Sequence, residues 1–494
     1  MRASGILLPV ASLPGPYGIG TLGRPAHRFV DFLAGAGQKY WQILPIGPTG
    51  FGDSPYQTAS AFAGSPYLID LDTLAEEGLL ARAEIEGADW GGDPSRIDYG
   101  KLYENRGAVL RLAFRRGWER DRAAVERFAA EQGDWLVPYA EFMALRGFFG
   151  MRARTEWDDA RVRSHAAPGF DGAMAEYRAL LAEDIRYHIY TQLLFFRQWD
   201  ALRAHARDRG VRLIGDVPIY VPLDSADVWS RPELFRLGAD GEPTEVAGVP
   251  PDYFTADGQL WGNPLYDWER MERDGFAWWL RRLGWSARLF DAVRIDHFRG
   301  LESYWAVPRG ESTARGGRWR RGPGRRFTDA VRAALPELPV IAEDLGFLTP
   351  EVETLRRESG WPGMKVLEFA FDPHEPSSYL PHNVGADCVC YTGTHDNPPL
   401  GEWAAGLLSE QADYVREYFG LSPQGDMRQA LLRGGMRTAA ELFVSQLSDW
   451  LDGGGRINTP GVLGRGNWCW RAPENALSEA LAARMARMCR LYGR

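Results

Sequence analysis

Three acidic residues, Asp296, Glu343 and Asp396, each follow a short apolar segment and could together carry out nucleophilic and acid–base chemistry on one bond. A carboxylate can attack an electron-poor carbon, and a carboxylic acid whose pKa is raised by burial can protonate a leaving oxygen. Taken singly, an acidic residue at the end of a strand is more often a turn or helix-cap residue. Three of them after three different apolar segments favour a shared catalytic site.

Arg294 strengthens this interpretation for Asp296. On an extended strand, residues two apart point to the same face, so the two side chains are neighbours. A guanidinium at that position holds the carboxylate ionised and oriented, as a nucleophile requires. Retaining glycosidases place two carboxylates about 5 Å apart, one to attack the anomeric carbon and one to donate and then accept a proton. The pattern therefore predicts a site that acts on a bond to a sugar.

Eight apolar segments must position these residues. Most are continuously apolar, as expected for parallel strands that are buried on both faces. Helical patterns lie between several of them, for example at residues 25–36 and 327–334. This alternation predicts an α/β protein with a closed (β/α)₈ barrel, whose active site lies at the carboxyl ends of the strands. The predicted strands are residues 5–10, 41–46, 212–217, 291–297, 340–345, 366–371, 387–392 and 441–446.

The spacing of the strands predicts large insertions within a single catalytic domain of residues 1–494. Helical periodicity in residues 102–132 and 139–205 predicts a helical insertion over residues 75–205. A second insertion, residues 222–285, carries a long structured loop over residues 246–268 that is rich in glycine, proline and aromatic residues. About 50 residues follow the last strand and have a helical or irregular pattern, so no C-terminal β-sandwich is expected.

The amino-acid composition limits the kinds of partner and compartment that are expected for this protein. The net charge of −9 argues against a nucleic-acid carrier, which is usually basic. Residues 309–326 contain seven arginines; a solvated loop is favoured over a phosphate or nucleic-acid site. The N-terminal apolar run stops at Pro9 and is interpreted as a first strand rather than a signal peptide. The four cysteines are too few for a disulfide framework and are interpreted as reduced thiols. No apolar run approaches the length of a membrane span. We predict a cytoplasmic protein with no nucleic-acid or membrane partner and no obligatory protein partner.

Several longer motifs resemble those of the 4-α-glucanotransferases called amylomaltases or disproportionating enzymes, which are relatives of the α-amylases. The resemblance covers nearly the whole chain. Besides the segments around the three acidic residues, its motifs are residues 12–20, 40–45, 52–57, 215–221, 248–254, 259–266 and 456–461.

The resemblance implies a role for each matching residue. Asp296 matches the nucleophile that forms a β-linked glucosyl ester, Glu343 the acid/base, and Asp396 the third carboxylate, which grips hydroxyls of the donor sugar. Further residues match substrate-binding positions: Tyr56, Asp216, Tyr253, Phe254, Gln259, Trp261, Asn263, Arg294, Phe369 and His395.

The resemblance also implies the reaction. Segments of α-1,4-glucan would move from a donor maltooligosaccharide or starch chain to the 4-hydroxyl of an acceptor glucan or glucose. No cofactor is expected. No metal is expected either, because Val217 follows Asp216 where α-amylases carry a calcium-binding Asn. The loop at Tyr253 and Phe254 is expected to favour an acceptor sugar over water. Two alternatives stay open at this point: a hydrolytic α-glucosidase or amylase, and a catalytically silent glucan-binding protein.

Overall fold

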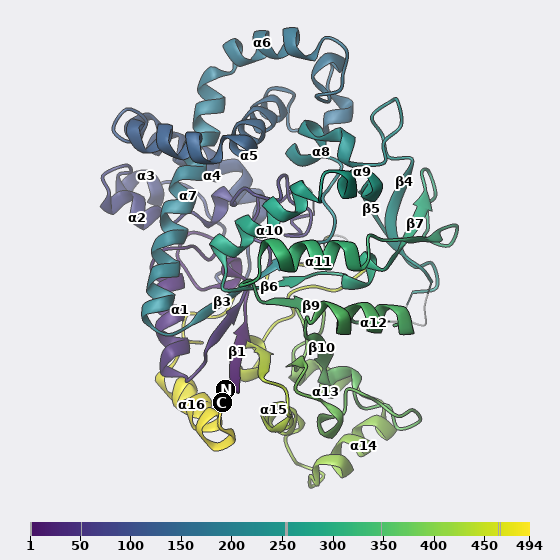
Figure 1. The fold of residues 1–494 in the computed structure, drawn as a ribbon. Coiled ribbons are helices and arrows are strands. Elements are labelled where there is room, and N and C mark those ends of the chain that lie inside the picture. Colours follow the sequence, from purple (N-terminus) through teal and green to yellow (C-terminus); the bar gives the residue numbers. More distant parts are fainter. Residues whose placement is uncertain (1, 51, 252–254, 347, 463, 465) are drawn as a thin grey trace.

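The structure is a computed structural model, and it describes residues 2–50, 52–251, 255–346, 348–462, 464 and 466–494 (Figure 1). The predicted residues Tyr253 and Phe254 lie outside the described residues. Within the described part of the chain, no helix is both long and apolar enough to cross a membrane.

Eight strands form one parallel sheet that curls into a barrel. They pair in the order β10, β11, β12, β1, β2, β3, β6 and β9. At the remaining seam the amide of Ala342 in β9 donates to the carbonyl of Pro362, just before β10, at 2.9 Å. The (β/α)₈ prediction is confirmed. The strands are β1 (Ala3–Leu7), β2 (Tyr40–Gln42), β3 (Arg212–Val217), β6 (Ala292–Ile295), β9 (Val340–Ala342), β10 (Gly363–Val366), β11 (Cys388–Tyr391) and β12 (Leu442–Gln446).

Most predicted strands run too far at their carboxyl ends. The clearest error is the strand predicted at residues 366–371, because β10 ends at Val366 and Leu367–Phe369 form a 3-10 helix. The apolar pattern continues past the last ladder hydrogen bond, since residues of the following loops are buried over the barrel. Leu44 and Ile46 after β2 are examples. Burial and strand pairing therefore end at different residues.

Helices cover the outside of the barrel. In α1 (Arg24–Gly35), Pro25 stands in the first turn, where its missing N–H removes no helical bond. The buried positions of α1 recur with helical spacing and pack against the sheet. The other covering helices are α10 (Ala277–Leu289), α11 (Arg325–Ala334), α12 (Pro350–Ser359), α13 (Leu400–Gly406), α14 (Ser409–Phe419), α15 (Met427–Arg437) and α16 (Glu479–Tyr492). After β12 the described residues contain no further strand.

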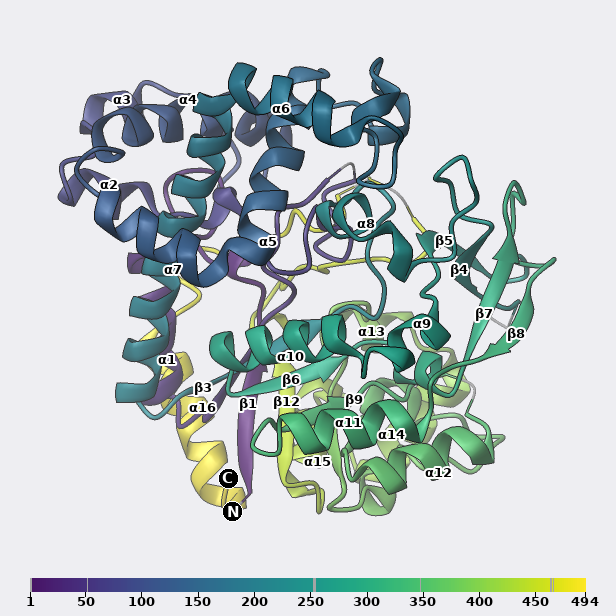
Figure 2. The ribbon, with the colours of Figure 1, turned by 45° about the horizontal axis from the view of Figure 1, so that its top comes forward.

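A mainly helical insertion lies between β2 and β3, at the top of Figures 1 and 2. Residues 149–169 form no α-helix and contain only turns, irregular segments and two short 3-10 helices, so the α-helical pattern predicted over 139–205 is wrong there. The last helix, α7, continues to Asp208 and packs on α1, α10 and β3 as a barrel helix. The boundaries 75–205 and 222–285 stay predictions. The helices are α2 (Leu71–Glu76), α3 (Arg82–Glu86), α4 (Tyr99–Gly117), α5 (Arg122–Phe148), α6 (Phe170–Leu180) and α7 (Ala182–Asp208).

A separate four-stranded antiparallel sheet flanks the barrel, on the right in Figure 2. Its order is β5 (Gln259–Pro264), β4 (Glu245–Val249), β7 (Ser303–Pro308) and β8 (Arg318–Arg321). The segment predicted as a long loop thus contains two strands. Sequence patterns miss this sheet because β4 pairs with β7, about 60 residues away. Two short helices, α8 (Ala226–Ser230) and α9 (Trp268–Arg273), complete this region.

The arginine-rich segment 309–326 also differs from its prediction as a loop, because β8 lies within it. Its guanidinium groups pair with carboxylates of other segments. Arg318 and Arg320 share Glu245 at 2.8 and 2.7 Å, and Arg309 pairs with Asp240 at 2.6 Å. These pairs neutralise much of the local positive charge, which leaves little basis for an anion site.

Candidate active site

The predicted catalytic residues meet at the carboxyl end of the barrel. Asp216 in β3 pairs in register with Arg294 in β6, and Ile295 of β6 pairs with Ala342 of β9. The next residues along these two strands are Asp296 and Glu343. They therefore leave adjacent strands at the same level, which brings nucleophile and acid/base candidates side by side.

Arg294 joins two of the carboxylates. Its Nη1 donates to Asp216 Oδ1 and Oδ2 at 2.8 and 2.9 Å and to Asp296 Oδ1 at 3.0 Å. The side chains of Arg294 and Asp216 are 5% and 0% exposed, whereas that of Asp296 is 26% exposed. The buried Arg294–Asp216 ion pair thus forms the floor of the site. The carboxylate of Asp296 is partly exposed to solvent above it. The contact with the guanidinium fixes the orientation of the Asp296 carboxylate, as its proposed role as a nucleophile requires.

Glu343 occupies a different environment. Burial raises the pKa of its carboxyl from 4.5 to about 8; the neighbouring Asp296 charge adds to this, while Arg294 opposes it. The amides of His297 and Leu345 donate to its two oxygens at 2.6 and 3.1 Å and fix its orientation. Glu343 is therefore protonated at neutral pH and can serve as a general acid.

His297 supports Glu343 through its backbone, a role that the sequence analysis missed. It has a left-handed conformation with φ of 49°, and its amide donates to Glu343. Its ring meets the edge of the Trp261 ring, with centroids 4.9 Å apart. Burial lowers the pKa of its imidazole to about 4, so the ring is neutral. The motif around Asp296 contains this residue, but a contact made by the backbone leaves no signal in the residue type.

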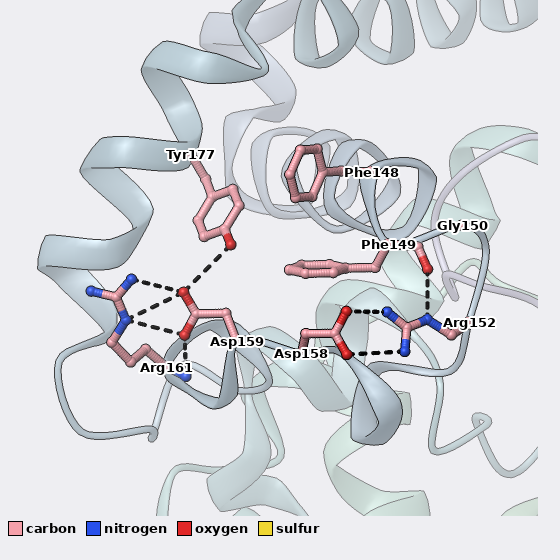
Figure 3. A pocket seen from close by; sticks show the side chains of 8 residues that line it. All are labelled: Phe148, Phe149, Gly150, Arg152, Asp158, Asp159, Arg161 and Tyr177. Atoms are coloured by element: carbon pink, nitrogen blue, oxygen red, sulfur yellow. Dashed lines mark hydrogen bonds and ion pairs between the residues drawn. The ribbon is translucent and has the colours of Figure 1, made fainter.

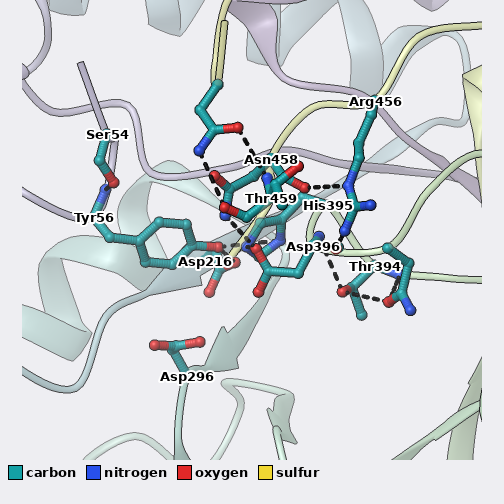
Figure 4. A network of polar contacts seen from close by, with 12 residues as sticks. Ser54, Tyr56, Asp216, Asp296, Thr394, His395, Asp396, Arg456, Asn458 and Thr459 are labelled. Carbon is teal, nitrogen blue, oxygen red and sulfur yellow. Dashed lines mark hydrogen bonds and ion pairs between the residues drawn. The ribbon is translucent and has the colours of Figure 1, made fainter. Parts of the chain in front are cut away.

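Asp396 lies in the turn after β11, held by a segment 60 residues further along the chain (Figure 4). Asn458 Nδ2 donates to Asp396 Oδ1 at 2.6 Å, and Arg456 Nη2 donates to the Asp396 carbonyl at 2.7 Å. His395 Nε2 lies 3.3 Å from the same carboxylate oxygen. The motif 456–461 contains both donors, although the sequence analysis assigned them no role.

Tyr56 connects the buried Arg294–Asp216 ion pair with the turn that contains Asp396. Its hydroxyl donates to Asp216 Oδ2 at 2.7 Å and lies 3.3 Å from His395 Nδ1. The rings of Tyr56 and His395 are stacked with centroids 5.0 Å apart. The centroid of the Trp468 ring lies 5.9 Å from each of them. Trp468, which the sequence analysis missed, has φ of 65°, and its carbonyl accepts a bond from the Tyr99 hydroxyl.

The remaining predicted substrate-binding residues lie in two places. Gln259, Trp261 and Asn263 alternate along β5 and share one face of that strand. Trp261 Nε1 donates to Gln259 Oε1 at 3.1 Å, and Asn263 Oδ1 accepts from Gln57 at 3.4 Å. Phe369 follows β10 and is 48% exposed.

Comparison with known proteins now identifies the family. A family model described as 4-alpha-glucanotransferase, glycoside hydrolase family 77, matches residues 8–477. The chain belongs to this 4-alpha-glucanotransferase family. It is 45% identical over 497 residues to a 4-alpha-glucanotransferase of Streptococcus pneumoniae, covering 100% of this chain and 97% of the relative. It is 47% identical over 501 residues to one from Thermus thermophilus, covering 99% and 98%.

Solved structures of the family agree with the fold. An amylomaltase from Streptococcus agalactiae in complex with acarbose matches with a TM-score of 0.96 and 40% identity, and both chains are covered completely. An amylomaltase from Corynebacterium glutamicum matches with a TM-score of 0.79 and 21% identity over 99% of this chain and 75% of the other, which bears on the fold alone.

Two further carboxyls lie beneath the Asp396 turn of this glucanotransferase-family chain. Glu368 is buried, and in the described part of the chain neither of its oxygens has a hydrogen bond of ordinary geometry. Burial and the negative charge of Asp449 raise its pKa well above the usual range. Burial also raises the pKa of Asp449 to about 6. Glu368 is therefore a neutral acid that packs beside Gly393 and Asn397 of the turn.

Proposed function

We propose that Asp296, Glu343 and Asp396 carry out α-glucan transfer by a retaining double displacement. Family membership makes the chain a 4-alpha-glucanotransferase, which moves α-1,4-glucan segments from a donor chain to the 4-hydroxyl of an acceptor. The single observation that supports these roles best is the contrast between two neighbouring carboxyls. Arg294 pairs with Asp296 at 3.0 Å, while burial raises the pKa of Glu343 to about 8 and keeps it protonated. Such a pair is what retaining glycoside chemistry requires.

In the first step, Glu343 gives its proton to the oxygen of the scissile bond while Asp296 attacks the anomeric carbon. The carbon–oxygen bond breaks, the shortened glucan leaves as an alcohol, and a β-linked glycosyl ester forms on Asp296. Glu343 is now a carboxylate.

In the second step, Glu343 takes the proton of the acceptor 4-hydroxyl. The oxygen of that hydroxyl attacks the anomeric carbon, the ester bond breaks and Asp296 is regenerated. Two inversions restore the α configuration.

We propose that Asp396, His395 and Tyr56 hold the donor sugar at the cleaved bond. Asp396 is 43% exposed in its side chain, so its carboxylate can accept bonds from sugar hydroxyls. Asn458 and Arg456 fix its position. Asp216 and Arg294 support the site from beneath, and we assign Gln259, Trp261, Asn263 and Phe369 to the walls of the groove.

Selection of a sugar acceptor over water is assigned to the loop that contains Tyr253 and Phe254. The described ends of this loop are Val249 at the end of β4 and Gln259 at the start of β5. Gln259 bonds to Trp261, which contacts His297 beside Glu343. The C-terminal end of the loop is therefore next to Glu343. From this position the loop can exclude water from the glycosyl ester. Replacing both aromatics with serine should raise hydrolysis relative to transfer, and an unchanged ratio would contradict this role.

Incubation with maltotriose tests the function. Glucose together with a ladder of longer maltooligosaccharides is the expected outcome. Glucose and maltose alone would indicate a hydrolase, and unchanged substrate a glucan-binding protein. Asp296→Asn should abolish the activity, and transfer at the wild-type rate would refute its assignment as the nucleophile.

We also propose that the protein acts in the cytoplasm on α-1,4-glucans and maltooligosaccharides, with glucose as an acceptor. Its four cysteines are free thiols and three are buried, which fits a reducing compartment. No nucleic-acid partner and no obligatory protein partner are assigned. Fractionation of source cells followed by the maltotriose assay would test the location.

A further inference from the structure

An open bowl lies on the helical insertion, where α5 ends (Figure 3). Its volume is about 810 Å³. Three aromatic rings and two ion pairs surround it. The mechanism above uses none of these residues.

The aromatic part consists of Phe148, Phe149 and Tyr177. Their ring centroids lie 5.1 to 5.9 Å apart, so the rings support one another. Phe149 is buried and stacks on Trp157 at 5.2 Å, which fixes the cluster to the protein. Phe148 stays 51% exposed. A ligand that covers the exposed Phe148 ring removes apolar surface from water, which favours binding.

The polar part consists of two Arg–Asp pairs. Arg152 binds both oxygens of Asp158 at 3.2 and 2.5 Å, and Arg161 binds Asp159 at 2.8 Å. The Tyr177 hydroxyl donates to Asp159 at 3.4 Å. The two positive and two negative charges cancel within each pair, so the bowl has no net attraction for an ion. Its fixed donors and acceptors suit a neutral ligand with many hydroxyls.

The bowl is fastened to the end of the barrel that carries the active site. Arg154, which lies between Arg152 and Asp158 in the chain, is buried, and its side chain donates to the carbonyl of Leu223 at 3.0 Å. Its amide donates to Asp224 at 2.9 Å, and Asp224 also pairs with Arg146 near the end of α5. Residues 223 and 224 belong to the loop that leaves β3 just after Asp216. These contacts fix the bowl to the loop that follows β3, on the active-site end of the barrel.

We propose that this bowl is a second glucan site, which binds a segment of an α-1,4-glucan chain outside the catalytic groove. Phe148 and Tyr177 contact the apolar face of a glucose residue, and the Arg–Asp pairs bond to its hydroxyls. A glucan fits better than other polymers because it is neutral, hydroxylated and has one apolar ring face. The inference rests on the proposed function, since the same polymer is the substrate of the active site.

The site is tested with Phe148→Ser and with the double variant Phe148→Ser/Tyr177→Ser. Leu408→Ser is the matched control, because Leu408 is a similarly exposed apolar residue (64%) on the barrel side of the molecule, at the start of α14. Retention of the native protein in an amylose-containing gel should fall for the bowl variants and not for the control. The KM for amylose should rise about fivefold, equivalent to about 1 kcal/mol. Transfer on maltotriose should stay at the wild-type rate, because maltotriose is short enough to use the catalytic groove alone.

Wild-type retention and an unchanged KM for amylose in the double variant would overturn the proposal. A dimer in sedimentation that Phe148→Ser dissociates, with amylose retention unaffected, would also overturn it and would make the bowl a protein contact. Failure of the proposed function has a different signature: wild-type protein would leave maltotriose unchanged. Amylose retention that depends on Phe148 would support the second site even then.

Discussion

Replacing Glu343 with glutamine should stabilise the protein at neutral pH while it removes the proposed general acid. The pKa of Glu343 lies at about 8 in the folded protein and at 4.5 ordinarily. Between these values the folded state holds a proton that the unfolded chain releases. The free energy of unfolding of the wild type therefore falls as pH rises through this window, and it does not fall further above pH 8. Glutamine does not titrate, so the free energy of unfolding of the variant does not fall in this pH range for this reason.

The magnitude follows from two opposing effects. At pH 7, keeping the proton on Glu343 costs about 3 kcal/mol, at about 1.4 kcal/mol for each pH unit above 4.5. Glutamine has one carbonyl oxygen where the carboxyl has two oxygens, and those two accept from the amides of His297 and Leu345. Losing one of these bonds costs about 1 kcal/mol. The net gain is about 2 kcal/mol at pH 7 and near zero at pH 5.

Thermal melts of wild type and Glu343→Gln at pH 5, 7 and 8.5 measure this difference. With an unfolding entropy of about 2.1 cal/mol/K per residue, a gain of about 2 kcal/mol raises Tm by about 2 °C. Glu375→Gln, at an exposed glutamate, is the control and should show no such pH dependence. Transfer on maltotriose should fall at least a hundredfold. A variant with the same Tm offset at all three pH values would refute the reasoning, as would one that is less stable than the wild type at pH 8.5.

Three other substitutions test the surroundings of the site. Arg294→Met leaves Asp216 and Asp296 without their cation, so thermal melts should show a loss of about 3–5 kcal/mol and transfer should disappear; an unchanged Tm would contradict the buried ion pair. Tyr56→Phe keeps the ring but removes the bond to Asp216, and kcat/KM for maltotriose should fall about tenfold, whereas full activity would show that the hydroxyl is dispensable. Glu368→Gln replaces a neutral acid with a neutral amide, so transfer should persist and Tm should rise more at pH 7 than at pH 5; equal Tm changes at both values would contradict burial of a protonated carboxyl.

The barrel and its carboxylates could be predicted from the sequence because both depend on local patterns. A parallel strand that is buried on both faces is apolar along its length, and the residue after its last pair points into the active-site end. Asp296 and Glu343 therefore followed from their places after two apolar segments. The register of β6 with β9 agrees with that reasoning.

Contacts between distant segments could not be predicted in this way. In the four-stranded sheet, β4 pairs with β7 across about 60 residues, and no short window of sequence contains both of these strands. Asn458 reaches Asp396 across 62 residues.

The sequence by itself determined which groups are available for chemistry: three carboxylates, an arginine beside one of them, and the strands that carry them. Only the tertiary structure decided how each group behaves. Glu343 has the same side chain as Glu375, but burial beside Asp296 raises its pKa to about 8 and makes it an acid at neutral pH. His297 acts through an amide that its left-handed turn aims at Glu343. Dielectric environment and backbone direction arise from packing, so residue types alone do not carry them.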